Sequence, residues 1–219
     1  MNFETYINLL SGARMSKFIR ACNGDKVKAM RLYDYNLRLS GRMFEIVGMF
    51  EIILRNRIND HYLTHFNDPN WIVNQAHNGM MLSEKEVDIQ NIASGFQHDG
   101  VYSNDKMVSS FTLGFWTYMF TKRRYRLGNK TLLRIFPNRP RNTKNSDVFR
   151  DLSEIREFRN RIAHHEPICF DANGYASSQF SRKYYTLMKN YLVFMGLDAE
   201  SVLRGVENPH NVFESIDSI

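Results

Sequence analysis

A long stretch without proline most constrains what this chain can fold into. No proline occurs between Gly24 and Asp68, and the segment there is DKVKAMRLYDYNLRLSGRMFEIVGMFEIILRNRINDHYLTHF. Proline interrupts helices, and strands need alternating β-branched runs bounded by turn residues, which this sequence lacks. The stretch therefore predicts one long helix, or two helices in series with a break near Ser40-Gly41.

The rest of the chain divides into further predicted helices separated by polar loops. Asn, Asp, Pro and Gly predict loops at residues 67–79, 97–106 and 137–147. Helices are expected near residues 83–96, 147–165, 176–196 and 198–205, and Ser83 with Glu86 fits a capping box at the start of the first of these. We therefore predict an all-α fold, a helical bundle in a single domain (residues 1–205) followed by a polar C-terminal tail (206–219).

Composition and cysteine use argue against several classes of protein. Cys22 and Cys169 are far apart and form no Cys-x-x-Cys pair, which argues against a disulfide scaffold or a zinc site. We expect no other metal and no cofactor. The N-terminus, MNFETYINLL, lacks the basic-then-apolar order of a signal peptide. The uncharged run MVSSFTLGFWTYMFT is too short to span a bilayer. We expect a cytoplasmic protein without membrane contact, in which Trp71 and Trp116 anchor the core.

The positive charge of the chain is concentrated in one segment. The net charge is +6, yet the segment from Lys106 to Ser146 contains ten Lys or Arg and no acidic residue, with Phe, Trp and Tyr interleaved. Such one-sided charge favours an anionic partner, of which nucleic acid is the usual one, although a solvated basic face is the alternative. The expected RNA-binding residues are Lys122, Arg123, Arg124, Arg126, Lys130 and Arg134.

A charged residue also interrupts the apolar stripe of the helix expected at 147–165. The stripe has helical spacing and consists of Val148, Leu152, Ile155, Phe158 and Ile162. Arg159 falls on the same side, and His164 and His165 follow just before Pro167, in the sequence REFRNRIAHHEP. A buried guanidinium needs an anionic partner, either an internal carboxylate or a phosphate ligand.

Arginine, asparagine and histidine close together suit the cleavage of an RNA phosphodiester. Histidine can accept the proton of a ribose 2′-hydroxyl or donate one to the departing 5′-oxygen. The guanidinium of Arg159 stays charged and can bind the phosphate in the transition state, and Asn160 can orient either partner. Because the nucleophile is the neighbouring 2′-hydroxyl, this chemistry needs no metal ion.

The segment FRNRIAHHEPI resembles the Arg-x4–6-His signature of HEPN domains. The chain resembles more specifically the Abi (abortive infection, AbiD/AbiF-like) branch of that superfamily, over residues 5–195. The segments that carry this resemblance are, in order, YDYNLRLSGRMFEIVGMFEIILRNRINDHYLTHFNDPNW, SSFTLGFWTYMF and EIREFRNRIAHHEPI. The resemblance implies a HEPN-like helical bundle with additional N-terminal helices, phage defence, and metal-independent ribonuclease activity or the binding of a small regulatory RNA. It assigns catalysis to Arg159, Asn160 and either His164 or His165.

A second candidate motif lies within the long proline-free stretch. The sequence EIILRNRINDH places Arg55, Asn56 and His61 in a similar order, and Glu51 one helical turn before Arg55. HEPN nucleases usually combine two motifs in one active site, so the resemblance implies either a monomer with a composite site or a homodimer. The alternative for this motif is a structural Glu51–Arg55 ion pair.

Overall fold

Helices make up almost all regular structure in residues 3–77 and 83–219, the part of the chain that the computed structural model describes. Within these ranges the only β pairing is an isolated bridge between Phe170 and Ala176. The all-α prediction is therefore confirmed. The helices are α1 (Phe3–Leu10), α2 (Gly12–Ala21), α3 (Lys26–Phe66), α4 (Trp71–His77), α5 (Ser83–His98), α6 (Asn104–Ser110), α7 (Leu113–Tyr118), α8 (Lys122–Leu127), the 3₁₀ turn η1 (Leu132–Ile135), α9 (Asn145–Ala163), α10 (Gln179–Phe194), α11 (Ala199–Leu203) and α12 (His210–Asp217).

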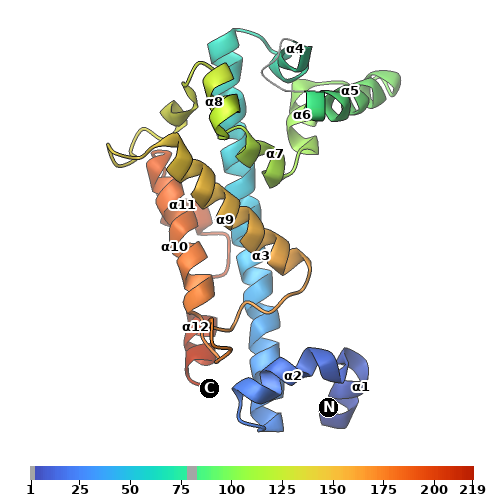
Figure 1. Cartoon of the computed structure of the whole chain (residues 1–219), viewed down its shortest axis with the longest axis vertical. Coiled ribbons are helices and arrows are strands. Elements are labelled where there is room, and N and C mark those ends of the chain that lie inside the picture. The colour runs from blue at the N-terminus through green and yellow to red at the C-terminus, as the bar shows by residue number, and fades with distance from the viewer. Residues whose placement is uncertain (1–2, 78–82) are drawn as a thin grey trace. The chain divides into compact units, whose positions relative to one another are not determined.

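The proline-free stretch folds as one unbroken helix, α3 (Figure 1). Gly24, with a φ of 85°, ends the preceding turn, and the Asp25 carboxylate accepts hydrogen bonds from the backbone N–H groups of Val27 and Lys28. These bonds satisfy N–H groups that have no partner inside the helix. The helix continues through Ser40 and Gly41, since a glycine without a cap or a proline nearby weakens a helix but does not end it.

The chain divides into two compact units. The first contains residues 1–48, 157–190 and 198–219, and the second contains residues 49–156 and 191–197. Helices α3, α9 and α10 each contribute to both units. The Arg159–His165 segment therefore belongs to the first unit, and the Glu51–His61 segment belongs to the second.

The first unit has an aromatic core around the ends of α3, α9 and α10. The ring of Phe158 stacks on that of Tyr184 at 4.5 Å, and Phe18 packs against Tyr33 at 5.1 Å. The predicted stripe on α9, which spans both units, is buried at every position named above. Its apolar spacing therefore identified the inner face of the helix correctly.

The second unit is anchored by two fully buried tryptophans, as predicted. The indole N–H of Trp71 donates to Asn59 Oδ1 at 2.9 Å, and that of Trp116 donates to the backbone oxygen of Phe111 at 3.3 Å. A buried indole keeps its polar atom satisfied in this way.

The prediction of a loop at residues 67–79 is wrong, because α4 occupies Trp71–His77. Asp68 accepts hydrogen bonds from the backbone N–H of Asn70 and the side chain of Asn74. An acidic residue followed by Pro69 is a helix-start signal that the polar composition concealed. The predicted helix at 83–96 is present as α5, whereas the capping box on Ser83 lies outside the described side chains.

The C-terminal segment also differs from the predicted polar tail. Residues 210–217 form α12, in which Val212, Phe213 and Ile216 are buried. Asp217 accepts hydrogen bonds from Ser178 and Arg182 of the same unit. The spacing of the three apolar residues is helical and was hidden by the charged and polar residues around them. None of the helices within 3–77 and 83–219 is long and apolar enough to cross a membrane.

Candidate functional site

The Arg159–His165 segment lies where α9 ends. The backbone N–H of Glu166 donates to the carbonyl of Arg161, and that of His165 donates to the carbonyl of Ile162, both at 2.9 Å. This pair of bonds is a Schellman motif, in which the residue after the helix takes a left-handed conformation. That residue is His165, with a φ of 56°. The sequence of the turn thus directs two consecutive histidines out of the helix.

Side chains from three other elements hold this turn in place. The guanidinium of Arg14, on α2, donates to the backbone oxygen of His165 at 2.6 Å and to the hydroxyl of Tyr33 at 3.1 Å. The backbone N–H of Ile168 donates to the buried Asn36 Oδ1 at 2.9 Å, and the Ser181 hydroxyl donates to the Ile168 oxygen at 2.7 Å. The histidine pair therefore has a fixed backbone. Arg14 could not be recognised from the sequence, because it contacts a residue that is far away in the chain.

The predicted catalytic side chains are accessible to different degrees. Arg159 and Asn160 are half-buried, whereas His164 and His165 are exposed. Within the described residues, Arg159 makes no hydrogen bond or ion pair, so the internal salt bridge considered above is not formed. No hydrogen bond joins Arg159 to either histidine, and none of the four side chains lines the cavities described below.

Replacing His165 with glycine is expected to stabilise the protein. The left-handed region costs a residue with a Cβ atom about 1–2 kcal/mol, so His165→Gly should raise stability by about 1 kcal/mol and Tm by about 2–4 °C. Ala163→Gly, in the last helical turn, is the matched control and should lower stability by about 1 kcal/mol. Thermal melts followed by circular dichroism measure both changes. A decrease in Tm for both variants would mean that His165 is not strained.

The second candidate motif lies on α3, within the second unit. Glu51, Arg55 and His61 are half-buried and Asn56 is exposed. The expected Glu51–Arg55 ion pair is not formed among the described residues, and the buried Nε of Arg55 has no hydrogen-bond partner. The structural alternative for this motif therefore loses its support. His61, in contrast, lies beside a cavity.

This cavity has a volume of about 400 Å³ and two parallel imidazoles on its wall. The rings of His61 and His65 are 5.8 Å apart with an angle of 4° between their planes. Arg57 and Arg134 also line the cavity, and Asp60 is the one acidic residue in its lining among the residues that the structure describes. The lining is thus cationic and capable of hydrogen bonding, as an anion site requires. His65 was missed in the sequence, although its spacing of four from His61 places it on the same helix face.

Hydrogen bonds define the tautomers of both imidazoles. The Thr131 hydroxyl donates to the backbone oxygen of Gly128 at 3.0 Å, so it accepts from Nε2–H of His61 at 2.9 Å. This leaves Nδ1 of His61 as a proton acceptor. The side-chain amide of Asn129 donates to His65 Nε2 at 3.0 Å. Burial, His65 and Arg134 lower the pKa of His61 to about 4, so its imidazole is neutral at pH 7.

The lowered pKa of His61 makes stability depend on pH. In the unfolded chain the pKa is near 6.5, so the unfolded state binds more protons between pH 4 and pH 6.5. Stability should therefore rise with pH through this window, and His61→Gln should flatten the rise. Urea unfolding at pH 5 and pH 7.5 measures it, with the exposed His98→Gln as control. An unchanged pH dependence in His61→Gln would contradict a buried neutral imidazole.

Most cationic side chains of the basic segment, Lys106–Ser146, are exposed to solvent. Its exposed cations are Lys106, Lys122, Arg123, Arg126, Lys130, Arg134, Arg141 and Lys144. Arg139 is half-buried, and Arg124 is fully buried, with its guanidinium carbon 4.9 Å from the centre of the Tyr118 ring. The prediction that Arg124 contacts RNA is therefore wrong. The burial of Arg124 could not be predicted from the neighbouring residues, because the packing of α8 determines which of its arginines faces inward.

No cluster of three or more His, Cys, Asp or Glu residues suited to a metal ion occurs among the residues that the structure describes. The chain matches no protein-family model, no curated protein and no solved structure.

Proposed function

We propose that this chain is an RNA-binding protein of the HEPN type, of the Abi branch, that cleaves RNA without a metal ion. The observation that carries the proposal is the half-buried side chain of Arg159, which has no partner among the described residues and precedes two exposed histidines on a fixed turn. None of its nitrogens is a buried atom without a partner, so the guanidinium keeps solvent contact and can bind an anion. An RNA phosphate is such an anion.

The chemistry follows from the properties of these groups. One imidazole of His164 or His165 accepts the 2′-hydroxyl proton, the 2′-oxygen attacks the adjacent phosphorus, and the bond to the 5′-oxygen breaks. The leaving 5′-oxygen takes a proton from a second acid, and a 2′,3′-cyclic phosphate remains. Arg159 stabilises the charge that builds on the phosphate, and Asn160 orients its neighbours.

A second histidine is needed as the other proton-transfer group. The α9 motif of a second copy supplies one in a homodimer. Phage defence in the cytoplasm is the role that the family resemblance implies for such a ribonuclease.

A second candidate function is the holding of a small regulatory RNA without turnover. The exposed cations of the basic segment favour it, because they supply phosphate contacts independent of any catalytic group. The experiment is to purify the protein, extract any RNA that accompanies it, and incubate labelled RNA with the protein. Cleavage supports the nuclease, one intact co-purified RNA species without cleavage supports the holder, and the absence of both binding and cleavage rejects the two.

A further inference from the structure

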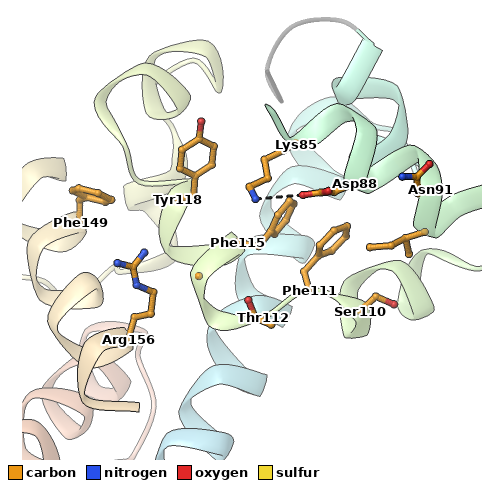
Figure 2. Close-up of a pocket in the computed structure, with 12 residues that line it drawn as sticks. Lys85, Asp88, Asn91, Ser110, Phe111, Thr112, Phe115, Tyr118, Phe149 and Arg156 are labelled. Atoms are coloured by element: carbon orange, nitrogen blue, oxygen red, sulfur yellow. Dashed lines mark hydrogen bonds and ion pairs between the residues drawn. The ribbon is translucent and has the colours of Figure 1, made fainter. Parts of the chain in front are cut away.

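A larger cavity of about 580 Å³ lies in the second unit, and none of the proposed catalytic residues lines it (Figure 2). Residues of α5, α7 and α9 and the segment before α7 line it. Its volume falls in the range of roughly 300–1,000 Å³ that is typical of small-molecule sites. The lining combines aromatic rings with a few polar groups, so the chemistry of its ligand can be inferred.

Four aromatic residues and Ile92 form the apolar part of this cavity. The rings of Phe111 and Phe115 stack at 4.0 Å with an angle of 16°, and Tyr118 and Phe149 are half-buried and line the same cavity. The buried guanidinium of Arg124 packs on the Tyr118 ring and so restrains it. Restrained aromatic faces beside an open volume are suited to stack a planar ring.

Polar groups surround the aromatic part. Lys85 and Asp88, both on α5, form an ion pair of 3.4 Å, and Asn91 is exposed on the same helix. In Figure 2, Arg156 lies on one side of the Phe115 ring and Asn91 on the other. Amide and carboxylate groups can hydrogen-bond the edge of a base, and the cations can meet its phosphate.

The surrounding charge favours the same class of ligand. Phe111, Phe115 and Tyr118 belong to the acid-free segment Lys106–Ser146, which carries ten cationic residues. A polyanion bound along the exposed cations of this segment would bring its bases to the aromatic residues embedded in it.

We propose that this cavity binds one unpaired base of an RNA strand, stacked on its aromatic side chains, with the flanking phosphates near Lys85 and Arg156. The proposal rests on the RNA binding proposed above and adds a subsite that neither motif supplies. Bases that are paired in a duplex are not accessible to such a cavity, so it selects single-stranded segments.

Gly114 allows the cavity to be filled without deleting its buried rings. A Cβ atom added there would lie 3.6 Å from Arg156 Cδ and from Thr112 Oγ1, which is ordinary van der Waals contact. Gly114→Leu therefore adds bulk to the cavity, and Gly95→Leu is the matched control, because nothing lies within 4 Å of a Cβ atom at Gly95. Asn91→Met fills the cavity from its exposed α5 wall and serves if Gly114→Leu fails to fold.

The test compares a labelled single-stranded RNA oligomer with an abasic oligomer of the same length, by fluorescence anisotropy. Wild-type protein should bind the base-bearing strand about 10-fold more tightly, the typical scale of one stacked base. Gly114→Leu should bring this ratio close to one without changing affinity for the abasic strand, and Gly95→Leu should leave it unchanged. A thermal melt verifies that each variant is folded.

The possible failures are distinguishable. Equal binding of both strands by wild-type protein, or an unchanged ratio in folded Gly114→Leu and Asn91→Met, would overturn the base site while leaving RNA binding intact. No binding of either strand would overturn the proposed function itself. Uridine or adenosine monophosphate that displaces the strand at a concentration close to the strand's own Kd would assign the cavity to free nucleotides instead.

Discussion

Replacing Arg159 or His164 with alanine is expected to slow RNA cleavage by a factor of about 10²–10⁴, the range that one general acid–base group or one transition-state charge contact supplies. Neither side chain makes a hydrogen bond or ion pair with the described residues, so truncation should leave the helical content and the Tm nearly unchanged. Single-turnover cleavage of labelled RNA and circular dichroism measure the two effects.

Matched control variants distinguish the loss of a catalytic group from the loss of a charge in general. Arg150→Ala removes an exposed arginine from the same helix, and His98→Ala removes an exposed histidine elsewhere. Both should cleave RNA at the wild-type rate. Full activity in His165→Gly together with loss in His164→Ala assigns the proton transfer to His164, and the reverse result assigns it to His165. Wild-type rates in both Arg159→Ala and His164→Ala would remove this segment from the mechanism.

Loss of two exposed arginines from the basic segment should weaken the salt dependence of RNA binding. Arg123 and Arg126 are both exposed on α8, unlike the buried Arg124 between them. Each phosphate contact with single-stranded RNA contributes about −0.7 to the slope of log K against log salt, so the double alanine variant should flatten the slope by about 1.4. Titrations at several salt concentrations provide the slope.

The control for this experiment keeps the same change of net charge. Arg31 and Arg38 are exposed on α3, outside the basic segment, and their double replacement should leave the slope nearly unchanged. An equal effect of the two double variants would mean that RNA responds to total charge rather than to this segment. An unchanged slope in Arg123→Ala/Arg126→Ala would identify the basic segment as a solvated face.

Long periodic elements could be predicted from the sequence, and short helices other than α11, expected at 198–205, could not. The absence of proline predicted α3, and apolar spacing predicted the buried face of α9. Helices α4 and α12 are 7 and 8 residues long, too short for their periodicity to stand out from polar neighbours. Asp68 before Pro69 was the available signal for α4, since both residues favour the first turn of a helix.

In the candidate site, features set by neighbouring residues could be predicted from the sequence, and contacts between distant residues could not. The position of His165 after α9 follows from the chain itself, because Pro167 disfavours continuation of the helix. The burial of Arg124 and the contact of Arg14 with the histidine turn depend on residues distant in the sequence. The absent Glu51–Arg55 ion pair also depends on side-chain conformations that the sequence does not specify. Helical spacing makes an ion pair possible but does not determine which rotamers the two side chains adopt.

We propose that this chain cleaves RNA through attack by the neighbouring 2′-hydroxyl, without a metal ion. The most direct measurement is the chemistry of the product ends after incubation of labelled RNA with purified protein in excess EDTA. We expect 2′,3′-cyclic phosphate and 5′-hydroxyl ends, and no cleavage where a single 2′-deoxynucleotide replaces the nucleotide at the cut site. Cleavage that requires added Mg²⁺ or Mn²⁺, or products with 5′-phosphate ends, would contradict it.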